Sequence, residues 1–392
     1  MASNIYLAGG AYTPMGGFNG AFAEVSAPRL AAASIRKSLE RAKLKPGDVD
    51  EVYLGNCISA GLGQSPARQA ALGAGLPPAC GVVTLNKMCG SGMRAIVFAS
   101  QAIQAGDASC IIAGGTENMT QAPYLLAKGR SGYRLGHGQV LDAMLRDGLL
   151  NAYDDRHMGV FAEICAKQYG FTREQQDDYA IASFKRALAA QDAGYFKNVI
   201  APVEVVSKRG TVVVDRDEEP AKFVEAKFRE LKPVFDPHGT ITAGNASAIS
   251  DGASSIAVLS ESRAKALGVP VQARVIGHAT ASQEPEWFTT APVAALRRLS
   301  DKLNLKLSDV ELFEINEAFA PVVLYAMKEL ELPHEKVNIF GGAIAMGHPI
   351  GSSGSRIVVS LINALKITGK KLGVACLCIG GGEASALALE IV

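Results

Sequence analysis

Hydrophobic residues along the chain fall into two alternating patterns, short apolar runs of strand length and longer stretches with helical periodicity. The apolar run at Val49–Ile58 follows a helix-like stretch at Leu30–Lys43, and similar pairs recur towards both ends of the sequence. Strands that alternate with helices are typical of α/β folds. We therefore expect an α/β fold built from repeated strand and helix units.

The two ends of the chain repeat the same order of elements. Near the N-terminus, DVDEVYLGNCISA precedes VVTLNKMCGSGMRAIVFASQAIQAG and ASCIIAGGTENM; near the C-terminus, DVELFEINEAFA precedes KVNIFGGAIAMGHPIGSSGSRIVVSLINAL and LGVACLCIGGGEASALALEIV. Asn56 precedes Cys89 by 33 positions, and Asn316 precedes His348 by 32. Three elements that match in order and spacing indicate an internal duplication rather than chance similarity.

The segment between the two copies has a different character. Residues 120–244 carry more charge, a long helical stretch at Thr172–Ala190 and the acidic run VDRDEEP, whose residues 215–219 we expect to form a solvated turn. We interpret this segment as an inserted, largely helical domain, after which a strand at Ser254–Leu259 returns to the first copy. The predicted organisation is an N-terminal half of residues 1–119 and 245–270, an insert of residues 120–244 and a C-terminal half of residues 271–392.

Composition limits the class of function. The chain has 392 residues, of which 48% are hydrophobic and 20% charged, enough to bury a core. A formal net charge of +1 gives no overall field that would attract nucleic acid or an anionic membrane, and no apolar run approaches the roughly 18 residues of a membrane span. The cysteines lack CxxC pairs and histidines at zinc-ligand spacing, and residues 1–10 lack the features of a secretory signal. We expect a folded, cytoplasmic protein without a structural metal.

Candidate chemistry lies beside glycines, where strands meet helices. Cys89, in NKMCGSGMRA, stands between an apolar strand and a helical pattern, where the helix dipole and free N–H groups would lower the thiol pKa from about 8.5. His348, in AMGHPIGSS, occupies the matching place in the second copy, so a pseudo-twofold fold would bring the imidazole to the thiol as its base. An inert buried cysteine and a structural histidine are the alternatives for each residue taken alone.

Two further candidates follow strands. Cys378 ends an apolar strand in CLCIGGGEA, and the N–H of the neighbouring Gly380 is a candidate oxyanion donor, with simple burial as the alternative for the thiol. Asn316, in EINEAFA, follows a strand at Glu311–Ile315 and taken alone is a candidate helix N-cap. The segment GGTEN at residues 114–118 lacks a full GxGxxG and is only a weak signal for nucleotide binding.

Seven motifs, in this order, resemble the thiolase family in its acetyl-CoA C-acetyltransferase branch, over the whole chain: NKMCGSGMRA, GGTENMT, HMGVFAE, TAGNASAISDGA, NEAFA, GGAIAMGHPIGSSGSR and CIGGG. The resemblance implies a duplicated five-layered α-β-α-β-α fold with an inserted helical loop domain that binds coenzyme A. It also implies a homodimer or homotetramer and a place in fatty acid metabolism.

The resemblance implies a role for each candidate residue. Cys89 matches the nucleophile that accepts an acyl group, and His348 matches the base that activates it. Cys378 matches the acid/base at the carbon next to the second thioester, Asn316 the residue that holds an oxyanion-hole water, and Gly380 an N–H donor. The implied reaction is the reversible condensation of two acetyl-CoA to acetoacetyl-CoA and CoA through an acetyl-Cys89 intermediate. It requires no metal or redox cofactor, and CoA is a substrate.

The same resemblance implies that coenzyme A lies on the loop domain and on TAGNAS. The implied contact residues are Ser247, Ala243, Phe235, Ala318 and Phe319, with His157 and Met158 at the acyl end; packing alone is the alternative for the aromatic residues. Some positions depart from the usual pattern: CIGGG continues with Glu383 rather than Met, WFTTAP carries Phe288 where Met is frequent, and Lys222 stands near the place of a phosphate-binding Arg. These departures leave the acyl-chain length and the phosphate contacts open.

The presence of all four catalytic candidates weighs against two classes of alternative. A decarboxylating ketoacyl synthase or a hydroxymethylglutaryl-CoA synthase also uses a Cys and a His but needs no second thiol at Cys378. A non-catalytic, lipid-binding thiolase-like protein would be expected to lack at least one of the four. A degradative 3-ketoacyl-CoA thiolase of broader chain length uses the same groups, and the sequence leaves this alternative and the physiological direction open.

Overall fold

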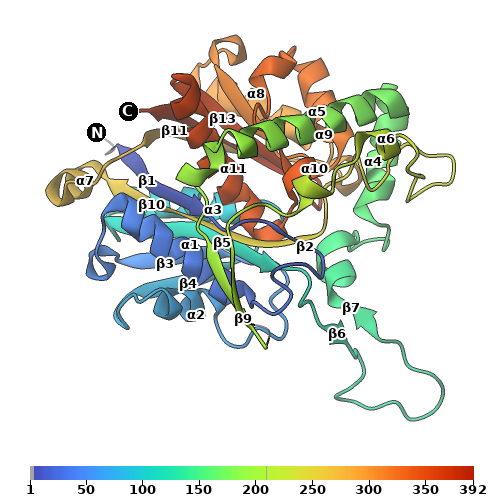
Figure 1. Cartoon of the computed structure of the whole chain (residues 1–392), viewed down its shortest axis with the longest axis horizontal. Helices are drawn as coiled ribbons and strands as arrows, with labels where there is room; N and C mark the ends of the chain where they lie inside the picture. Colours follow the sequence, from blue (N-terminus) through green and yellow to red (C-terminus); the bar gives the residue numbers. More distant parts are fainter. Residues whose placement is uncertain (1–3, 209) are drawn as a thin grey trace.

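The computed structural model describes residues 4–208 and 210–392, which form two similar α/β halves and an insert (Figure 1). The first half contains β1 (Ile5–Tyr12), β2 (Gly16–Gly17), β3 (Glu51–Gly55), β4 (Gly81–Leu85), β5 (Cys110–Asn118), β10 (Ser250–Ser260), α1 (Ala27–Ala42), α2 (Pro66–Gly73), α3 (Ser91–Ala105) and α7 (Glu261–Leu267). The second contains β11 (Ala273–Ser282), β12 (Leu312–Ile315), β13 (Leu372–Ile379), β14 (Glu383–Ile391), α8 (Ala291–Leu303), α9 (Ala320–Glu329), α10 (Ala343–Met346) and α11 (Ile350–Thr368).

The insert contains β6 (Tyr124–Leu125), β7 (Leu141–Asp142), β8 (Val203–Ser207), β9 (Gly210–Val214), α4 (Met158–Tyr169), α5 (Arg173–Asp192), α6 (Glu225–Phe228) and a π-helix at Leu145–Leu149. Short 3-10 helices lie at Pro46–Asp48, Tyr195–Asn198, Glu219–Lys222, Pro285–Trp287, Leu307–Asp309 and His334–Lys336. Among the described residues, no helix is both long enough and apolar enough to cross a bilayer.

The main sheet of the described chain repeats one strand order in both halves. It runs β12-β13-β14-β11-β1-β10-β5-β3-β4, and β2 pairs with β10. The strands β4, β3 and β5 are parallel, as are β12 and β13, whereas β10, β1, β11 and β14 pair antiparallel with their neighbours. The counterpart of β4 is reduced to a parallel bridge between Phe313 and Val337. This repetition agrees with the predicted duplication, and β10 confirms the predicted return strand.

Helices α3 and α11 form the central layer between the halves. Helix α3 packs on β3, β5 and β10 and also reaches β14, while α11 packs on β5 and β10 as well as on β12 and β13. All residues of Ile350–Leu365 except Ser360 are buried, which explains why this helix is apolar or small on every side. Gly115 on β5 lies so close to α11 that a β-carbon on it would be 1.9 Å from the carbonyl oxygen of Gly351. The N-terminal end of α11 is therefore fixed against the first half.

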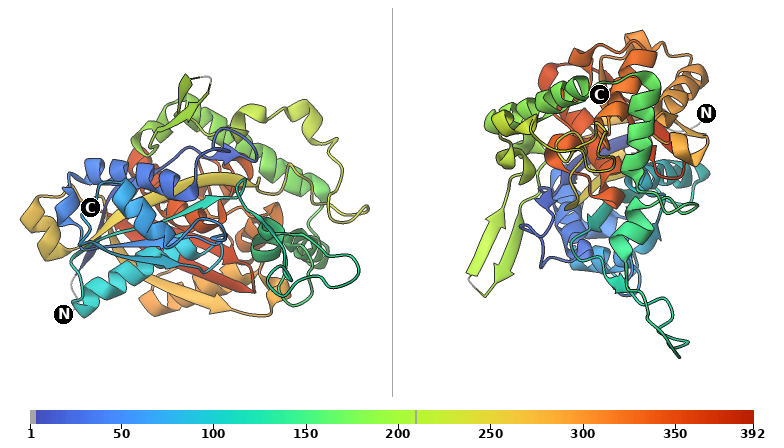
Figure 2. Two further views of the ribbon diagram at one scale, coloured as in Figure 1. Left: turned by 90° about the horizontal axis from the view of Figure 1, so that it is seen from below. Right: turned by 90° about the vertical axis from the view of Figure 1, so that its right-hand side faces the viewer.

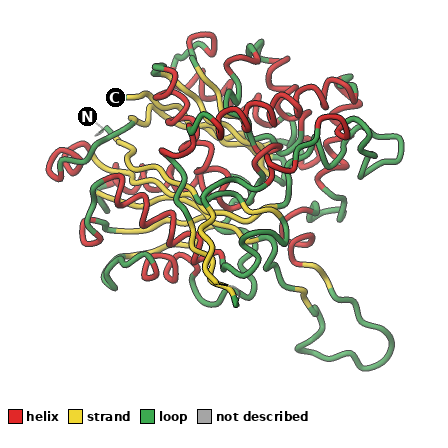
Figure 3. The backbone as a smooth tube through the Cα atoms, in the orientation of Figure 1, coloured by secondary structure: helices red, strands yellow, loops and turns green. Residues whose placement is uncertain are grey.

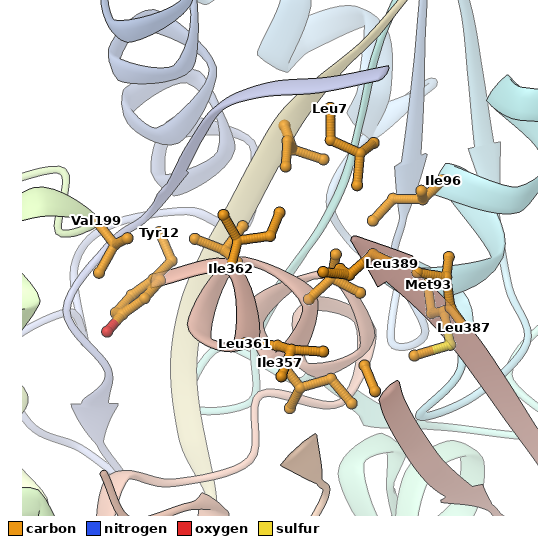
Figure 4. Close-up of a cluster of buried hydrophobic side chains, with 14 of the residues drawn as sticks. Leu7, Tyr12, Met93, Ile96, Val199, Ile357, Leu361, Ile362, Leu387 and Leu389 are labelled. Atoms are coloured by element: carbon orange, nitrogen blue, oxygen red, sulfur yellow. The ribbon is translucent and has the colours of Figure 1, made fainter. Parts of the chain in front are cut away.

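The shared hydrophobic core surrounds α11 and draws on both halves. Figure 4 labels ten of its buried side chains, Leu7, Tyr12, Met93, Ile96, Val199, Ile357, Leu361, Ile362, Leu387 and Leu389. Helices α1 and α2 cover the outer side of the first half, and α8 and α9 cover that of the second. Helical and strand layers thus alternate across the molecule (Figure 3).

The insert is less helical than we expected. Apart from α4 and α5 it consists mainly of loops and of the hairpins β6–β7 and β8–β9, and both the loop at residues 126–140 and the β8–β9 ribbon project from the body (Figure 2). Residues 126–140 contain four glycines and no repeated apolar spacing, while VVSKRGTVVVD is rich in valine, which favours strands. The predicted helix at Thr172–Ala190 is confirmed as α5, with Thr172 as its N-cap.

The acidic run at residues 215–219 is not the solvated turn that we expected. Asp217 is buried, and its carboxylate accepts a hydrogen bond of 2.8 Å from the backbone N–H of Met15. Burial raises the pKa of Asp217 to about 6. Glu218 accepts two more backbone N–H groups from the loop after β1. Asp217 is buried and Glu218 half-buried because their carboxylates pair backbone donors that would otherwise lack partners, and they join the insert to the first half, whereas Asp215 stays exposed.

Gly115→Ala is expected to destabilise the protein by about 1 to 3 kcal/mol, because the new methyl group overlaps the Gly351 carbonyl and neither backbone has room to move. Urea unfolding followed by circular dichroism measures the change. Gly47→Ala is the matched control, since a β-carbon at Gly47 meets nothing within 4 Å. We expect the control to stay within about 0.5 kcal/mol of the natural protein. Equal stability of the two variants would contradict the prediction.

Candidate active site

The residues predicted from the sequence gather around one pocket between the two halves and the insert. It encloses about 540 Å³ and is lined mainly by apolar side chains with a few polar groups, as is typical of small-molecule sites. The predicted residues on its wall are Cys89, His348, Cys378, Gly380, Ser247, Ala243, Phe235, His157, Met158, Ala318 and Phe319. The wall also contains residues that were not predicted, among them Phe18, Met88, Leu149, Val234, Thr242, Ile249 and Ile350. Asn316 is buried and does not line this pocket.

Cys89 lies in a tight turn between β4 and α3. The carbonyl of Lys87 accepts a hydrogen bond of 3.0 Å from the N–H of Gly90, and Met88 takes a φ of 48°. The backbone N–H groups of Gly380 and of Cys89 itself interact with the sulfur. The turn therefore places the thiol against two donors that could stabilise an oxyanion on a bound acyl group.

The thiol of Cys89 is not activated in advance, contrary to our expectation. Burial raises its pKa to about 11, and the two N–H groups and the helix end do not compensate. A thiolate in this pocket loses more hydration than these donors replace, so the neutral form is favoured. A base must therefore remove the proton as acyl transfer occurs at neutral pH.

His348 is a neutral imidazole with a free lone pair. Its Nδ1 lies 2.5 Å from the Oγ of Ser353, whose hydroxyl donates to the carbonyl of Pro349 at 3.0 Å. Because that hydroxyl has one proton, Nδ1 carries the hydrogen and Nε2 the lone pair. Nε2 is buried without a hydrogen-bond partner among the described residues. Burial, together with the charge of Arg356, lowers the pKa of His348 to about 3, so the imidazole can act as a base.

The turn that carries His348 is held against the segment before β10. The N–H of His348 donates to the carbonyl of Ala248 at 3.1 Å. Gly347 has a φ of 101°, and a β-carbon there would lie 2.1 Å from the Oγ of Ser250. This close approach explains why a glycine precedes the histidine.

Asn316 is not a helix N-cap, because α9 begins at Ala320 and its N-cap is Phe319. The backbone N–H of Asn316 donates to the carbonyl of Cys376 at 2.9 Å. Its side-chain Nδ2 and Oδ1 are both buried without a partner among the described residues. Unmatched buried polar atoms are costly, so this amide fits a residue that holds a water molecule beside the pocket.

Cys378 is buried at the end of β13, in an apolar cluster that also contains Phe288 and Phe319. Burial raises the pKa of its thiol well above the ordinary value, and the neighbouring Cys89 raises it further. A thiolate formed here would be a strong base, because a high pKa of the acid means a strong conjugate base. Such a base suits proton removal from a carbon next to a thioester.

Two buried carboxylates that sequence analysis missed hold the loops around these residues. Glu117 accepts backbone N–H groups of Cys57 and Gly351 at 3.0 and 2.9 Å, and burial raises its pKa to about 7. Glu317 accepts the hydroxyl of Tyr179 at 2.8 Å. Both glutamates lie inside the motifs GGTENMT and NEAFA, but the sequence alone does not indicate that their side chains are buried.

The insert supplies the opposite wall. His157 is the N-cap of α4 and stacks on Phe235 with ring centroids 4.6 Å apart, and a β-carbon on Gly159 would lie 2.1 Å from the Phe235 ring. The N–H of Ser247 donates to the carbonyl of Ala318 at 3.0 Å, which joins TAGNAS to NEAFA. Within residues 4–208 and 210–392, no group of three or more His, Cys, Asp or Glu side chains is arranged to hold a metal ion.

Comparison with known proteins identifies the family. The profile of the thiolase N-terminal domain matches residues 5–262, and that of the C-terminal domain matches residues 269–391. The chain belongs to the thiolase family. The relative named acetyl-CoA acetyltransferase 2, from Arabidopsis thaliana, is 48% identical over 99% of this chain and 97% of its own length. Acetyl-CoA acetyltransferase of Escherichia coli K12 is 48% identical over 99% of both chains.

Solved thiolase structures match the whole fold. The acetyl-CoA acetyltransferase of Bacillus anthracis superposes with a TM-score of 0.97 at 40% identity, covering 100% of this chain and 99% of that one. The Acat5 thiolase from Ascaris suum, in complex with coenzyme A, superposes with a TM-score of 0.94 at 39% identity, covering 99% and 100%. These matches confirm the predicted duplicated thiolase fold.

Alkylation of Cys89 by iodoacetamide in the free protein is expected to accelerate about tenfold per pH unit between about pH 7 and pH 9.5, because the reactive thiolate stays a minor form below a pKa of about 11. Mass spectrometry of the peptide that contains Cys89 measures the rate. A small thiol with a pKa of about 8.5 is the reference and levels off earlier. A Cys89 rate that is already constant at neutral pH would reveal a preformed thiolate and overturn the prediction.

Proposed function

We propose that this thiolase is an acetyl-CoA acetyltransferase, which condenses two acetyl-CoA to acetoacetyl-CoA and CoA and catalyses the reverse thiolysis. The observation that supports it best is the combination, in one pocket, of a neutral histidine base with two thiols of high pKa, the half-buried Cys89 and the buried Cys378. Relatives of this name, 48% identical over almost the full chain, support the same reaction. The reaction needs no metal or redox cofactor, and CoA is both substrate and product.

In the proposed first step, the sulfur of Cys89 attacks the thioester carbon of acetyl-CoA while Nε2 of His348 accepts the thiol proton. The negative charge on the thioester oxygen is stabilised by the N–H groups of Cys89 and Gly380. Each such donor typically contributes about 2.7 to 4 kcal/mol to lowering the barrier. The bond to the CoA sulfur then breaks, and the leaving thiolate takes a proton from Cys378. Acetyl-Cys89, free CoA, an imidazolium and a Cys378 thiolate result.

In the proposed second step, the Cys378 thiolate removes a proton from the methyl group of a second acetyl-CoA. The enolate oxygen accepts hydrogen bonds from Nε2–H of His348 and from the water held by Asn316. The enolate carbon attacks the acetyl group on Cys89, the new tetrahedral oxyanion uses the N–H groups described above, and the Cys89 thiolate leaves. It recovers its proton from His348, so every group returns to its starting state and acetoacetyl-CoA is released.

For the acyl-CoA itself, we propose that the pantetheine arm follows the wall between the insert and TAGNAS. Ser247 and the Ala243 carbonyl offer polar contacts, and Phe235 stacked on His157 offers an apolar side. Lys222 forms an ion pair of 2.7 Å with Glu219, so it is not a free cation for a CoA phosphate.

We extend the proposal to self-association in the cytoplasm, in a homodimer or homotetramer that serves fatty acid metabolism. Support for self-association comes from exposed apolar side chains. Val83 on the edge strand β4 is 47% exposed, and Leu135 in the projecting loop is 99% exposed. Exposed apolar groups at such places are typical of surfaces that another chain covers.

The proposed activity is tested by mixing the purified protein with acetoacetyl-CoA and CoA and following the loss of the thioester enolate absorbance. We expect turnover by the natural protein and none by Cys89→Ala. In parallel, mass spectrometry after acetyl-CoA addition should find one acetyl group on the peptide that contains Cys89. Absence of turnover in well-folded protein would refute the proposed activity, and an acetyl group retained by Cys89→Ala would show that the nucleophile is misassigned.

Phe288 should limit the acyl chain and so exclude the broad, degradative alternative. Its ring is buried beside Cys378, with centroids 6.5 Å from Phe161 and 6.4 Å from Phe319. We expect Phe288→Ala to raise kcat/KM for 3-ketohexanoyl-CoA relative to acetoacetyl-CoA about tenfold, since the variant makes room for two more methylenes. A panel of 3-ketoacyl-CoA substrates of increasing length measures this. Equal use of short and long chains by the natural protein would instead favour the degradative thiolase.

A further inference from the structure

An ion pair behind the pocket wall joins two segments that carry the predicted oxyanion donors. The carboxylate of Glu383 lies 2.6 Å from Nζ of Lys87, and its other oxygen accepts a hydrogen bond of 3.2 Å from Ser282. The Lys87 side chain is 22% exposed and the Glu383 side chain is 34% exposed, and neither residue is on the pocket wall. Any effect of this ion pair on the reaction must therefore pass through other groups rather than through contact with the substrate.

Lys87 opens the turn that presents Cys89. Its carbonyl closes that turn by accepting the N–H of Gly90, and its own N–H donates to Oγ of Ser91 at 2.8 Å. The position of the Lys87 backbone therefore sets the position of the N–H of Cys89, two residues further on.

Glu383 closes the turn that presents Gly380. It pairs with Ile379 across the hairpin of β13 and β14, so the residues between them form the connecting turn. Gly381 and Gly382 in this turn have φ values of 92° and 85°, and the Gly382 carbonyl accepts a hydrogen bond of 2.9 Å from the N–H of Gln283. Anchoring Glu383 therefore restricts where the N–H of Gly380 can lie.

The two donors belong to different halves of the molecule, so no local backbone geometry fixes the distance between them. Packing supplies one link, because a β-carbon on Gly90 would lie 2.5 Å from the Cδ1 of Ile379. The ion pair supplies a second, polar link at the far end of both turns. We propose that Lys87 and Glu383 are positioning residues that set the spacing of the Cys89 and Gly380 N–H groups. This inference rests on the proposed acyltransferase function.

Two steps of the reaction depend on different groups in the site. Acyl transfer to and from Cys89 uses the two N–H donors, whereas proton removal from acetyl-CoA uses Cys378 with the His348 and Asn316 groups. Exchange of labelled CoA into acetyl-CoA reports on the first step. Uptake of deuterium from solvent into the acetyl methyl group, with excess acetyl-CoA and no added CoA, reports on the second, because the excess acetyl-CoA acetylates Cys89 again after each turnover.

Glu383→Gln is expected to lower the maximal rate of CoA exchange about tenfold, since small misplacements of a catalytic donor are costly, and to leave the KM for acetyl-CoA unchanged. Deuterium uptake should stay at the natural rate. Lys87→Met should give the same pattern and provides an independent test should one variant fold poorly. The exchanged pair, Lys87→Glu with Glu383→Lys, should recover most of the CoA exchange rate.

Glu390→Gln is the matched control. Glu390 lies at the other end of β14 and pairs with Arg274 at 2.8 Å, with side-chain exposures of 39% and 37%. We expect this variant to exchange CoA at the natural rate. The inference is overturned if Glu383→Gln and Lys87→Met exchange CoA normally, if both measured rates fall equally, or if Glu390→Gln shows the same loss. If the natural protein shows neither exchange, the proposed function fails and the inference fails with it.

Discussion

The site depends on the close backbone contact between α11 and the first half of the molecule. Glycines allow this contact: a β-carbon on Gly92 of α3 would lie 2.5 Å from Ser355, and one on Gly115 would meet the Gly351 carbonyl. At the same interface Ser254 and Ser355 lie 2.6 Å apart through their hydroxyl groups. Because small residues line both sides, two helix ends from different halves come within reach of one another. His348 and Cys89 can therefore share one pocket.

That close packing also determines the charges in the pocket. Packing around the site displaces water, which favours the neutral form of the groups that it buries. The thiols of Cys89 and Cys378 are held as acids of high pKa, while the pKa of His348 falls to about 3. In this environment charge is unfavourable in the free enzyme and appears once the reaction begins, when the N–H groups and the imidazolium can stabilise it. A site whose thiols and imidazole are neutral in the free enzyme is thus compatible with a reaction whose intermediates are anionic.

Most of the fold, and the residues that gather around one pocket, could be predicted from the sequence, because they depend on local patterns. Alternation of strands and helices, repeated spacings and glycine turns identified both halves and placed Cys89 and His348 at equivalent junctions. The errors concern burial. The charge of Asp217 indicated a side chain exposed to solvent, and the position of Cys89 before a helix indicated a low thiol pKa. Both expectations were wrong, because each property depends on distant segments that surround the residue. The tautomer of His348 likewise could not be predicted, because it is set by a contact with Ser353 that only the folded structure shows.

The projecting hairpins and loops of the insert were also difficult to predict from the sequence. Its two hairpins leave little apolar repetition in the sequence, and its attachment combines carboxylates on backbone donors with apolar packing, in which Phe196 and Val199 join the shared core.

Electrostatics explains why a glutamate at position 383 is compatible with the proposed chemistry. An unpaired carboxylate near the Gly380 turn would repel the oxyanion that forms at the N–H groups of Cys89 and Gly380, with solvent screening part of this repulsion because the Glu383 side chain is 34% exposed. Lys87 lies 2.6 Å from that carboxylate, so the pair presents a dipole rather than a net negative charge to the pocket. Neutralisation and positioning therefore come from one contact, and a change to either partner alone removes the link that sets the geometry of the oxyanion donors.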